Sequence, residues 1–137
     1  MNTAFASLNP WRAVSWLVLT SVALALSGCG DGRSSPPVKV DVARETLRAT
    51  LEKWQAGATP DSLQQETPKI VVQDFDWSGG ARLIAFEVLN GDEPVDANLI
   101  AKVKLTLQTG EAAPAEKTVT YVVGTSPVLT VFRDMFR

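Results

Sequence analysis

The first amphipathic segment of the chain has the period of an α-helix. Apolar side chains recur three or four positions apart on one side of it and charged side chains occupy the other; the apolar stripe is Ala43, Leu47, Leu51 and Trp54. Asp41 is the candidate N-cap, and Gly57 supplies the left-handed residue that ends such a helix. A short helical turn is predicted next, because Thr59 precedes a proline at the first helical position. Leu63 would be its inward residue.

After Pro68 the hydrophobic period changes to two, which is typical of β-strands. Residues 99–108 alternate between apolar and polar side chains, so this strand is predicted to have one face in water. Ser78-Gly79-Gly80 is a hairpin signal between the first two strands, and residues 124–127 form a turn between the last two. Residues 90–98 are predicted to be a loop. The predicted strands cover residues 70–77, 81–89, 99–108, 117–123 and 128–132.

One helix followed by four or five antiparallel strands predicts an α+β domain in which the helix covers the apolar face of the sheet. The leading helix ends in Trp54-Gln55-Ala56-Gly57, long strands follow, and the segment 121–134 closes the chain. Over residues 40–134 this arrangement resembles the cystatin-like superfamily, specifically nuclear transport factor 2-like domains. The resemblance implies that the sheet is curled and that it encloses a cone-shaped pocket.

The N-terminal segment has the features of a secretory signal. Residues 13–26 are apolar apart from Ser15, Thr20 and Ser21, and Arg12 precedes them without any acidic residue. At about 1.5 Å per residue this run covers only about 21 Å, which is too short for a hydrocarbon core of about 30 Å. We therefore interpret it as the apolar region of a signal peptide and exclude it from the predicted fold.

The apolar run ends at Leu26-Ser27-Gly28-Cys29, which resembles the lipobox of bacterial lipoproteins. The resemblance implies that a signal peptidase recognises Leu26, Ser27 and Gly28, and that Cys29 becomes the first residue of the mature protein. Cys29 would carry about three acyl chains, whereas one chain binds a membrane only marginally. It is the only cysteine, so no disulfide within the chain can form. The alternative is that Cys29 is incidental and follows an ordinary secretory signal.

These features divide the chain into three parts. Residues 1–28 are predicted to be a cleaved signal peptide, residues 29–38 the lipidated cysteine and a flexible tether, and residues 39–137 a single α+β domain. The expected location is the cell envelope, where the lipid anchors the protein in a membrane. In lipoproteins of this type an aspartate directly after the cysteine favours the inner membrane. Gly30 stands there, so we expect the outer membrane, facing the periplasm, with the inner membrane as the alternative.

Composition removes several classes of function. The chain has no histidine, which excludes a Ser-His-Asp triad, a Cys-His pair and a His-ligated zinc site. Thirteen Lys and Arg residues against fifteen Asp and Glu residues give a net charge of −2, which is not typical of a nucleic-acid-binding protein. The sequence has neither a glycine-rich phosphate loop nor a dinucleotide-binding motif, so we expect no cofactor and no metal.

The segment Asp74-Phe75-Asp76-Trp77 is the strongest candidate for chemistry. On a strand, Asp74 and Asp76 would share one face, about 7 Å apart, and Phe75 and Trp77 would share the other. Two such carboxylates could serve as acid and base or as ligands of a hard cation. The sequence favours a simpler interpretation, in which solvated carboxylates lie opposite a buried aromatic pair, because no dense acidic loop accompanies them.

Three further residues are candidates for a binding site. Trp54 and Trp77 fall on predicted inward faces, where they would line a ligand pocket or, in the simpler interpretation, pack in the core. Arg133 ends the last strand together with Asp134. The two residues would lie at the mouth of a pocket or, in the simpler interpretation, form an exposed ion pair.

We therefore expect a membrane-anchored, non-enzymatic binding module with a protein or a small ligand as its partner. One alternative is a small hydrolase or isomerase that uses Asp74 or Asp76 inside a pocket. Another alternative is an accessory subunit of an envelope complex, held by an exposed strand edge.

Overall fold

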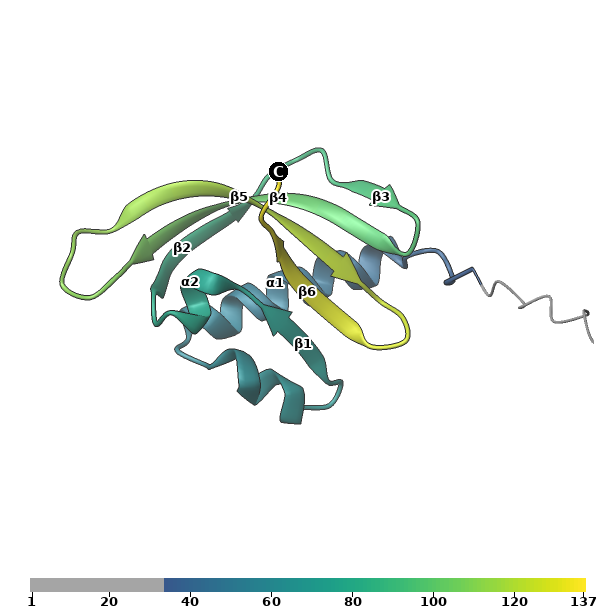
Figure 1. Cartoon of the computed structure of the whole chain (residues 1–137), viewed down its shortest axis with the longest axis horizontal. Helices are drawn as coiled ribbons and strands as arrows, with labels where there is room; N and C mark the ends of the chain where they lie inside the picture. The colour runs from purple at the N-terminus through teal and green to yellow at the C-terminus, as the bar shows by residue number, and fades with distance from the viewer. Residues whose placement is uncertain (1–33) are drawn as a thin grey trace, which may run out of the picture. The chain divides into compact units, whose positions relative to one another are not determined.

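The computed structural model describes residues 34–137, which contain two α-helices, one 3-10 helix and six β-strands (Figure 1). The predicted signal peptide, the residues Leu26, Ser27, Gly28 and Cys29, and the first part of the predicted tether lie outside the described residues. In chain order the elements are α1 (Val40–Gln55), η2 (Pro60–Gln65), β1 (Ile70–Gln73), α2 (Phe75–Ser78), β2 (Arg82–Val88), β3 (Glu93–Val95), β4 (Asn98–Gln108), β5 (Ala115–Gly124) and β6 (Leu129–Asp134).

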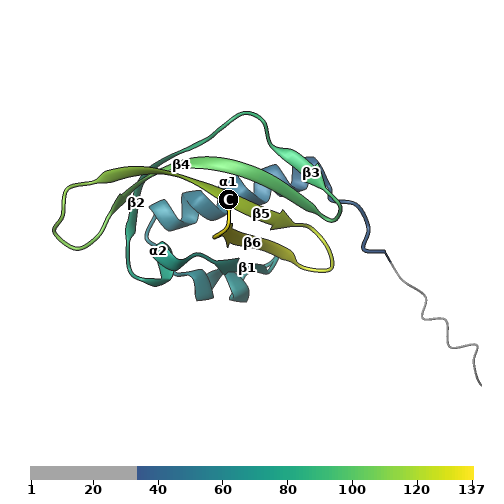
Figure 2. The ribbon, with the colours of Figure 1, turned by 45° about the horizontal axis from the view of Figure 1, so that its top comes forward.

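The six strands form one mixed sheet. Its order is β1-β6-β5-β4-β2, and β3 pairs separately with β4. β1 runs parallel to β6, whereas all the other strand pairs are antiparallel. Figures 1 and 2 show that the sheet curls into a half-barrel with α1 packed against its concave side. The predicted α+β class, with a helix packed on a curled sheet, is therefore confirmed.

The prediction of a purely antiparallel sheet with four or five strands is wrong. No hairpin forms through Ser78-Gly79-Gly80, because β1 ends at Gln73 and pairs with β6 instead of β2. β1 and β2 lie at opposite ends of the sheet order, so residues 74–81 connect the two ends of the half-barrel. In addition, the predicted loop 90–98 contains β3, which adds a short strand to β4.

The core lies between α1 and the concave face of the sheet. The predicted apolar stripe of α1 is buried, and so are the apolar positions of the alternating strand β4, as predicted. Burying each large apolar side chain stabilises the fold by about 1.5–3 kcal/mol. The core residues contributed by these two elements are Ala43, Leu47, Leu51, Trp54, Leu99, Ala101, Val103, Leu105 and Leu107.

The ends of the first helix are predicted partly correctly. α1 begins one residue before Asp41, so Asp41 lies in the first turn and is not the N-cap; its charge there still favours the helix dipole. Gly57 has φ +93° and ends the helix as expected. Thr59 is the N-cap of η2 by position, but its side chain makes no capping hydrogen bond. Leu63 is buried, as predicted.

Candidate functional site

The segment from Asp74 to Trp77 is a capped helical turn, and the prediction that it continues the strand is wrong. The side chain of Asp74 accepts a hydrogen bond from the backbone N–H of Trp77 at 3.0 Å, so Asp74 is the N-cap of α2. Aspartate competes well for this role because its short side chain bonds nearby backbone N–H groups. The predicted faces are therefore wrong as well. Asp74 is buried and Phe75 is 65% exposed, whereas Trp77 is buried as expected.

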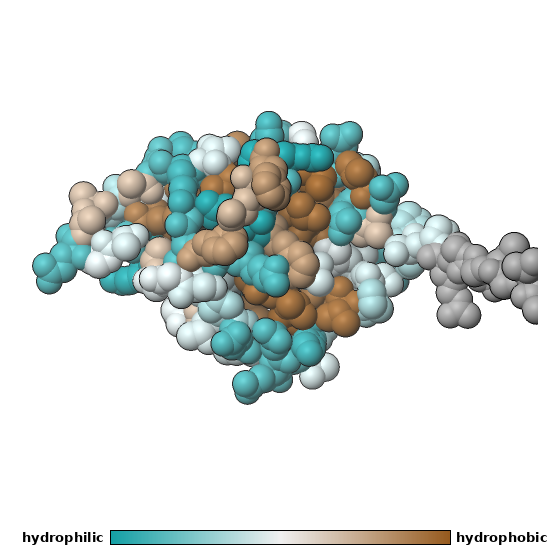
Figure 3. Space-filling view, in the orientation of Figure 1, coloured by the Kyte–Doolittle hydropathy of each residue, from teal (hydrophilic) through white to brown (hydrophobic). Residues whose placement is uncertain are grey.

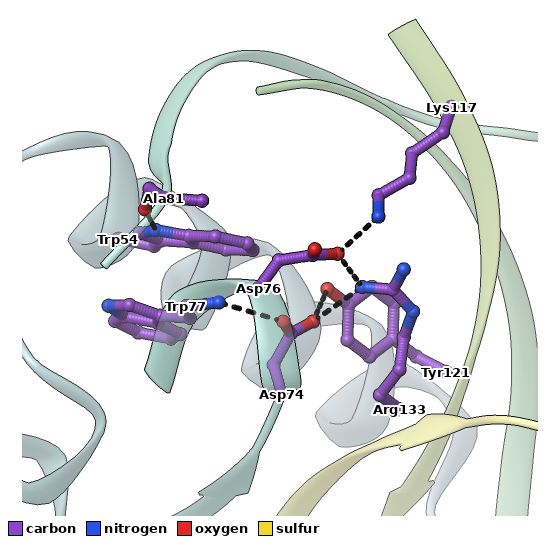
Figure 4. Close-up of polar contacts among 8 residues, drawn as sticks. All are labelled: Trp54, Asp74, Asp76, Trp77, Ala81, Lys117, Tyr121 and Arg133. Carbon is purple, nitrogen blue, oxygen red and sulfur yellow. Dashed lines mark hydrogen bonds and ion pairs between the residues drawn. The ribbon is translucent and has the colours of Figure 1, made fainter. Parts of the chain in front are cut away.

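Asp74 joins three elements of the fold through its carboxylate (Figure 4). The hydroxyl of Tyr121, in β5, donates to Oδ2 at 2.6 Å, and Nη1 of Arg133, in β6, donates to the same oxygen at 2.9 Å. Oδ1 accepts the hydrogen bond from the backbone N–H of Trp77. Tyr121 and Arg133 are cross-strand neighbours in the β5–β6 pair, which brings both donors to one side of the sheet. Both oxygens of a nearly fully buried carboxylate are thus occupied.

Asp76 lies beside these residues, closer to solvent than Asp74. Its Oδ2 is 3.1 Å from Nη1 of Arg133 and 2.6 Å from Nζ of Lys117, which belongs to β5 (Figure 4). Arg133 therefore bridges the buried Asp74 and the half-buried Asp76. We refer to Asp74, Asp76, Lys117, Tyr121 and Arg133 as the ionic cluster.

The environment of the ionic cluster shifts three pKa values. Burial raises the pKa of the Tyr121 hydroxyl, and the negative charge of Asp74 raises it further. Burial of Arg133 works against its charged form, but the hydrogen bond and charge of Asp74, together with the nearby Tyr121 and Asp76, keep its pKa above the ordinary value. Burial likewise opposes the ionised form of Asp76, yet the hydrogen bond from Lys117 and the charge of Arg133 hold its pKa below the ordinary value. Near neutral pH these groups hold their ion pairs.

The two tryptophans stack on each other next to this cluster. Their ring centroids lie 5.0 Å apart with an interplanar angle of 6°. Nε1 of Trp54 donates to the carbonyl of Ala81 at 2.9 Å, and Nε1 of Trp77 donates to the carbonyl of Ala58 at 2.8 Å. Both rings are buried, and they form the floor of an open hollow of about 310 Å³. Core packing therefore accounts for both rings; a ligand in the hollow stays a prediction.

Two further hollows lie along β5, on either side of the contact between Lys117 and Asp76. One has a volume of about 350 Å³ and is lined by Phe75, Val119, Arg133 and Met135, among others. The other has a volume of about 230 Å³; its lining includes Leu107, Ala112, Ala113 and Ala115. Asp76 and Lys117 line both hollows. We call the two hollows together the β5 groove.

Arg133 and Asp134 do not pair with each other. As consecutive strand residues they point to opposite faces, so Arg133 enters the ionic cluster while Asp134 accepts from the N–H of Phe136 at 2.8 Å. Sequence reasoning missed Tyr121 and Lys117. The signal for Tyr121 was the hairpin around residues 124–127, because that register places Tyr121 opposite Arg133. Nothing in the sequence indicated that Lys117 meets Asp76.

No protein-family model, curated protein or solved structure matches the chain significantly. Among residues 34–137, no helix has the length and apolar character that crossing a bilayer requires. Within the same range, acidic side chains do not gather in groups of three or more that could hold a metal ion. The role of the site therefore has to be argued from its own geometry.

Proposed function

We propose that this chain is a lipid-anchored lipoprotein of the bacterial cell envelope, and that its α+β domain acts by binding a protein or a small ligand. The observation that carries the anchor is Leu26-Ser27-Gly28-Cys29 at the end of an apolar run. Residues 30–39 separate Cys29 from α1; fully extended, they span roughly 33–36 Å. The lipid would therefore hold the domain close to the membrane surface, facing the periplasm at the outer membrane.

The curled sheet and its packed helix support the finer part of the proposal, a cystatin-like domain of the nuclear transport factor 2-like kind. Such a domain has a helix against the concave side of a strongly bent sheet, as α1 is here. The hollow over Trp54 and Trp77 is open to solvent, and it is the place where a small ligand would bind in such a domain.

The geometry of the two aspartates favours binding over the alternative of a hydrolase or isomerase. A general acid or base must reach the proton that it transfers. Asp74 cannot do so, because Tyr121, Arg133 and the N–H of Trp77 occupy its oxygens inside the fold. Asp76 is paired with Lys117 and Arg133, and its lowered pKa makes it a poor proton donor near neutral pH. Both carboxylates are placed to hold elements together.

The anchor is tested by substituting Cys29 in the full chain expressed in a Gram-negative host. Cys29→Ser removes the thiol that would take the lipid, so it should abolish incorporation of labelled palmitate and leave an uncleaved or soluble protein. Ser27→Ala keeps a small residue at the recognition site and is the matched control; it should be labelled and sediment with the outer membrane like the wild type. Palmitate labelling of Cys29→Ser at the wild-type level, or a Cys29→Ser protein that is still cleaved and still membrane-bound, would refute the anchor.

A further inference from the structure

We propose that the first half of β5, residues 115–119, binds an extended peptide segment of another protein, which adds a strand to the open side of the sheet. The inference rests on the proposed binding function and names the class of its partner. It depends on three features of the described residues: an unpaired strand edge, backbone groups that face outward along it, and a groove whose lining alternates in character.

The edge is open because β6 is shorter than β5. β6 pairs with β5 from Gly124↔Thr130 to Thr120↔Asp134 and goes no further. On its other side, β5 pairs with β4 over its whole length, down to Ala115↔Leu107. Within residues 34–137, no strand continues β6 along residues 115–119. Residues 115–118 are all exposed, whereas residues 119–124 are almost all buried.

The backbone groups of Glu116 and Thr118 face this open edge. In a strand, the N–H and C=O of alternate residues point to opposite sides. The carbonyl of Lys102 in β4 accepts from Leu89, which follows β2, so even-numbered residues of β4 face β2 and odd-numbered residues face β5. In the β4–β5 register, odd-numbered residues of β4 lie opposite odd-numbered residues of β5. The N–H and C=O groups of the even-numbered residues of β5 therefore face away from β4. The N–H of Gly124, which donates to Oγ1 of Thr130 in β6, agrees with this assignment.

The β5 groove runs beside the same edge and prescribes a side-chain pattern. Odd-numbered residues of β5 point to the concave side, as Tyr121 does. Along β5 the wall of the groove alternates from Ala115 through Lys117 to Val119. At the Val119 end the exposed apolar side chains of Phe75 and Met135 lie among the charged residues Arg133, Asp134 and Arg137. The middle of the groove is the polar contact between Lys117 and Asp76. A strand laid along the edge would thus present apolar, hydrogen-bonding and apolar side chains at every second position, over about 17 Å.

The other free edges are closed to such a partner. β2 carries a bulge between Leu83 and Ala85, and the carbonyl of Ile84 accepts from the side chain of Gln55 at 2.9 Å. β1 has only four residues, and η2 packs against it. β3 has only three residues, and one of them is Pro94. Short or bulged edges resist strand addition, so the first half of β5 is the edge suited to it.

A second copy of the chain fits this edge poorly. When two copies of the edge pair antiparallel with Glu116 opposite Thr118, Lys117 of one copy lies directly opposite Lys117 of the other. Like charges in directly opposed positions destabilise a strand pair. Residues 135–137 of the same chain would continue β6 along the edge, but the N–H of Phe136 is held by Asp134 and Phe136 is 97% exposed. A separate peptide is therefore the occupant that we propose.

The test uses the full chain in detergent and a displayed library of short linear peptides. We expect selected peptides to carry apolar residues two positions on either side of a polar one, and to slow hydrogen exchange at the amides of Glu116 and Thr118. Thr118→Pro removes the outward N–H and should weaken the selected peptides by about tenfold. Thr118→Val keeps that N–H and should bind like the wild type. Glu116→Pro is the second variant, with the same expected loss.

Three outcomes would overturn the inference. The first is the absence of any enriched peptide, and the second is equal binding to Thr118→Pro, Glu116→Pro and Thr118→Val. The third is slow exchange of the Glu116 and Thr118 amides before any peptide is added, which sedimentation would assign to a second copy or to residues 135–137. Because this assay needs no lipid, its result is independent of the palmitate experiment, and the two proposals can fail separately.

Discussion

The two halves of β5 have the same backbone conformation but different surroundings. Residues 120–124 lie between β4 and β6, and the strand is buried there on both sides of the ribbon. Residues 115–119 pair with β4 alone and are mostly exposed. We call residues 120–124 the closed half of β5 and residues 115–119 the open half. On the convex side, the closed half presents Val122 opposite Phe132, and Figure 3 shows apolar surface gathered over β6 and the adjoining end of β5. The open half presents Glu116 and Thr118 there instead.

Each half of β5 also holds one aspartate of the segment that connects β1 to β2. Tyr121, in the closed half, binds Asp74, and Lys117, in the open half, binds Asp76. Arg133 contacts both aspartates, but the contact of Tyr121 with Asp74 is buried, whereas that of Lys117 with Asp76 lies near the surface. The difference indicates that the closed half of β5 holds the segment between β1 and β2 by a strong, buried contact at Asp74, and that the open half holds it by a weak contact at Asp76. Variants in the two halves should therefore differ in cost.

The largest effect is expected for Asp74→Ala. The substitution leaves the guanidinium of Arg133 and the hydroxyl of Tyr121 buried without their acceptor, and α2 loses its cap. Breaking a buried pair in this way costs about 3–5 kcal/mol. Urea unfolding followed by circular dichroism measures the loss. Asp74→Asn keeps an acceptor oxygen and should lose less stability. A cost below about 1 kcal/mol for Asp74→Ala would contradict a strongly stabilising contact in the closed half.

A matched pair of proline variants compares the halves directly. The N–H of Val122 faces β6, so Val122→Pro removes a buried ladder bond and should cost about 2–3 kcal/mol. The N–H of Thr118 faces the open edge, where proline is tolerated, so Thr118→Pro should cost less than about 1 kcal/mol. Thermal unfolding measures both. Equal losses would mean that residues 115–119 are paired as tightly as residues 120–124.

The periodic parts of the fold were predictable from the sequence because one face of each element is buried. The stripe of α1 and the alternation of β4 both follow from this rule and match the structure. The parallel pairing of β1 with β6 was not predictable in the same way. It depends on contacts across more than fifty residues, such as Val72↔Val131, whereas the local signal at Ser78-Gly79-Gly80 indicated a hairpin.

The ionic cluster was harder to predict, for a physical reason. Asp74-Phe75-Asp76-Trp77 alternates like a strand, but the capping bond from Asp74 to the N–H of Trp77 and the buried partners of Asp74 favour a helical turn. The sequence pointed to Asp74, Asp76, Trp77 and Arg133 as candidates, and the structure brings them together. Their partners Tyr121 and Lys117 come from a strand more than forty residues away, a distance over which no periodicity carries information.

The smallest effect is expected for the contact of the open half, between Asp76 and Lys117. Because the folded-state pKa of Asp76 is lowered, its ionised form stabilises the fold above the ordinary aspartate pKa of about 3.9. That contribution is lost as the pH falls through 3.9 toward the lower, folded-state pKa. Asp76→Asn should therefore cost less than about 1 kcal/mol near neutral pH, and the difference from wild type should disappear in acid.

Urea unfolding of both proteins at neutral and acidic pH tests this last difference. Lys117→Met should lose a similar amount near neutral pH, whereas Lys102→Met, at an exposed position without an ion pair among residues 34–137, should lose nothing measurable. High salt should shrink the loss in Asp76→Asn, because the contact lies near solvent. A loss as large as that of Asp74→Ala, or one that grows in acid, would show that the contact at Asp76 stabilises the fold as strongly as the contact at Asp74.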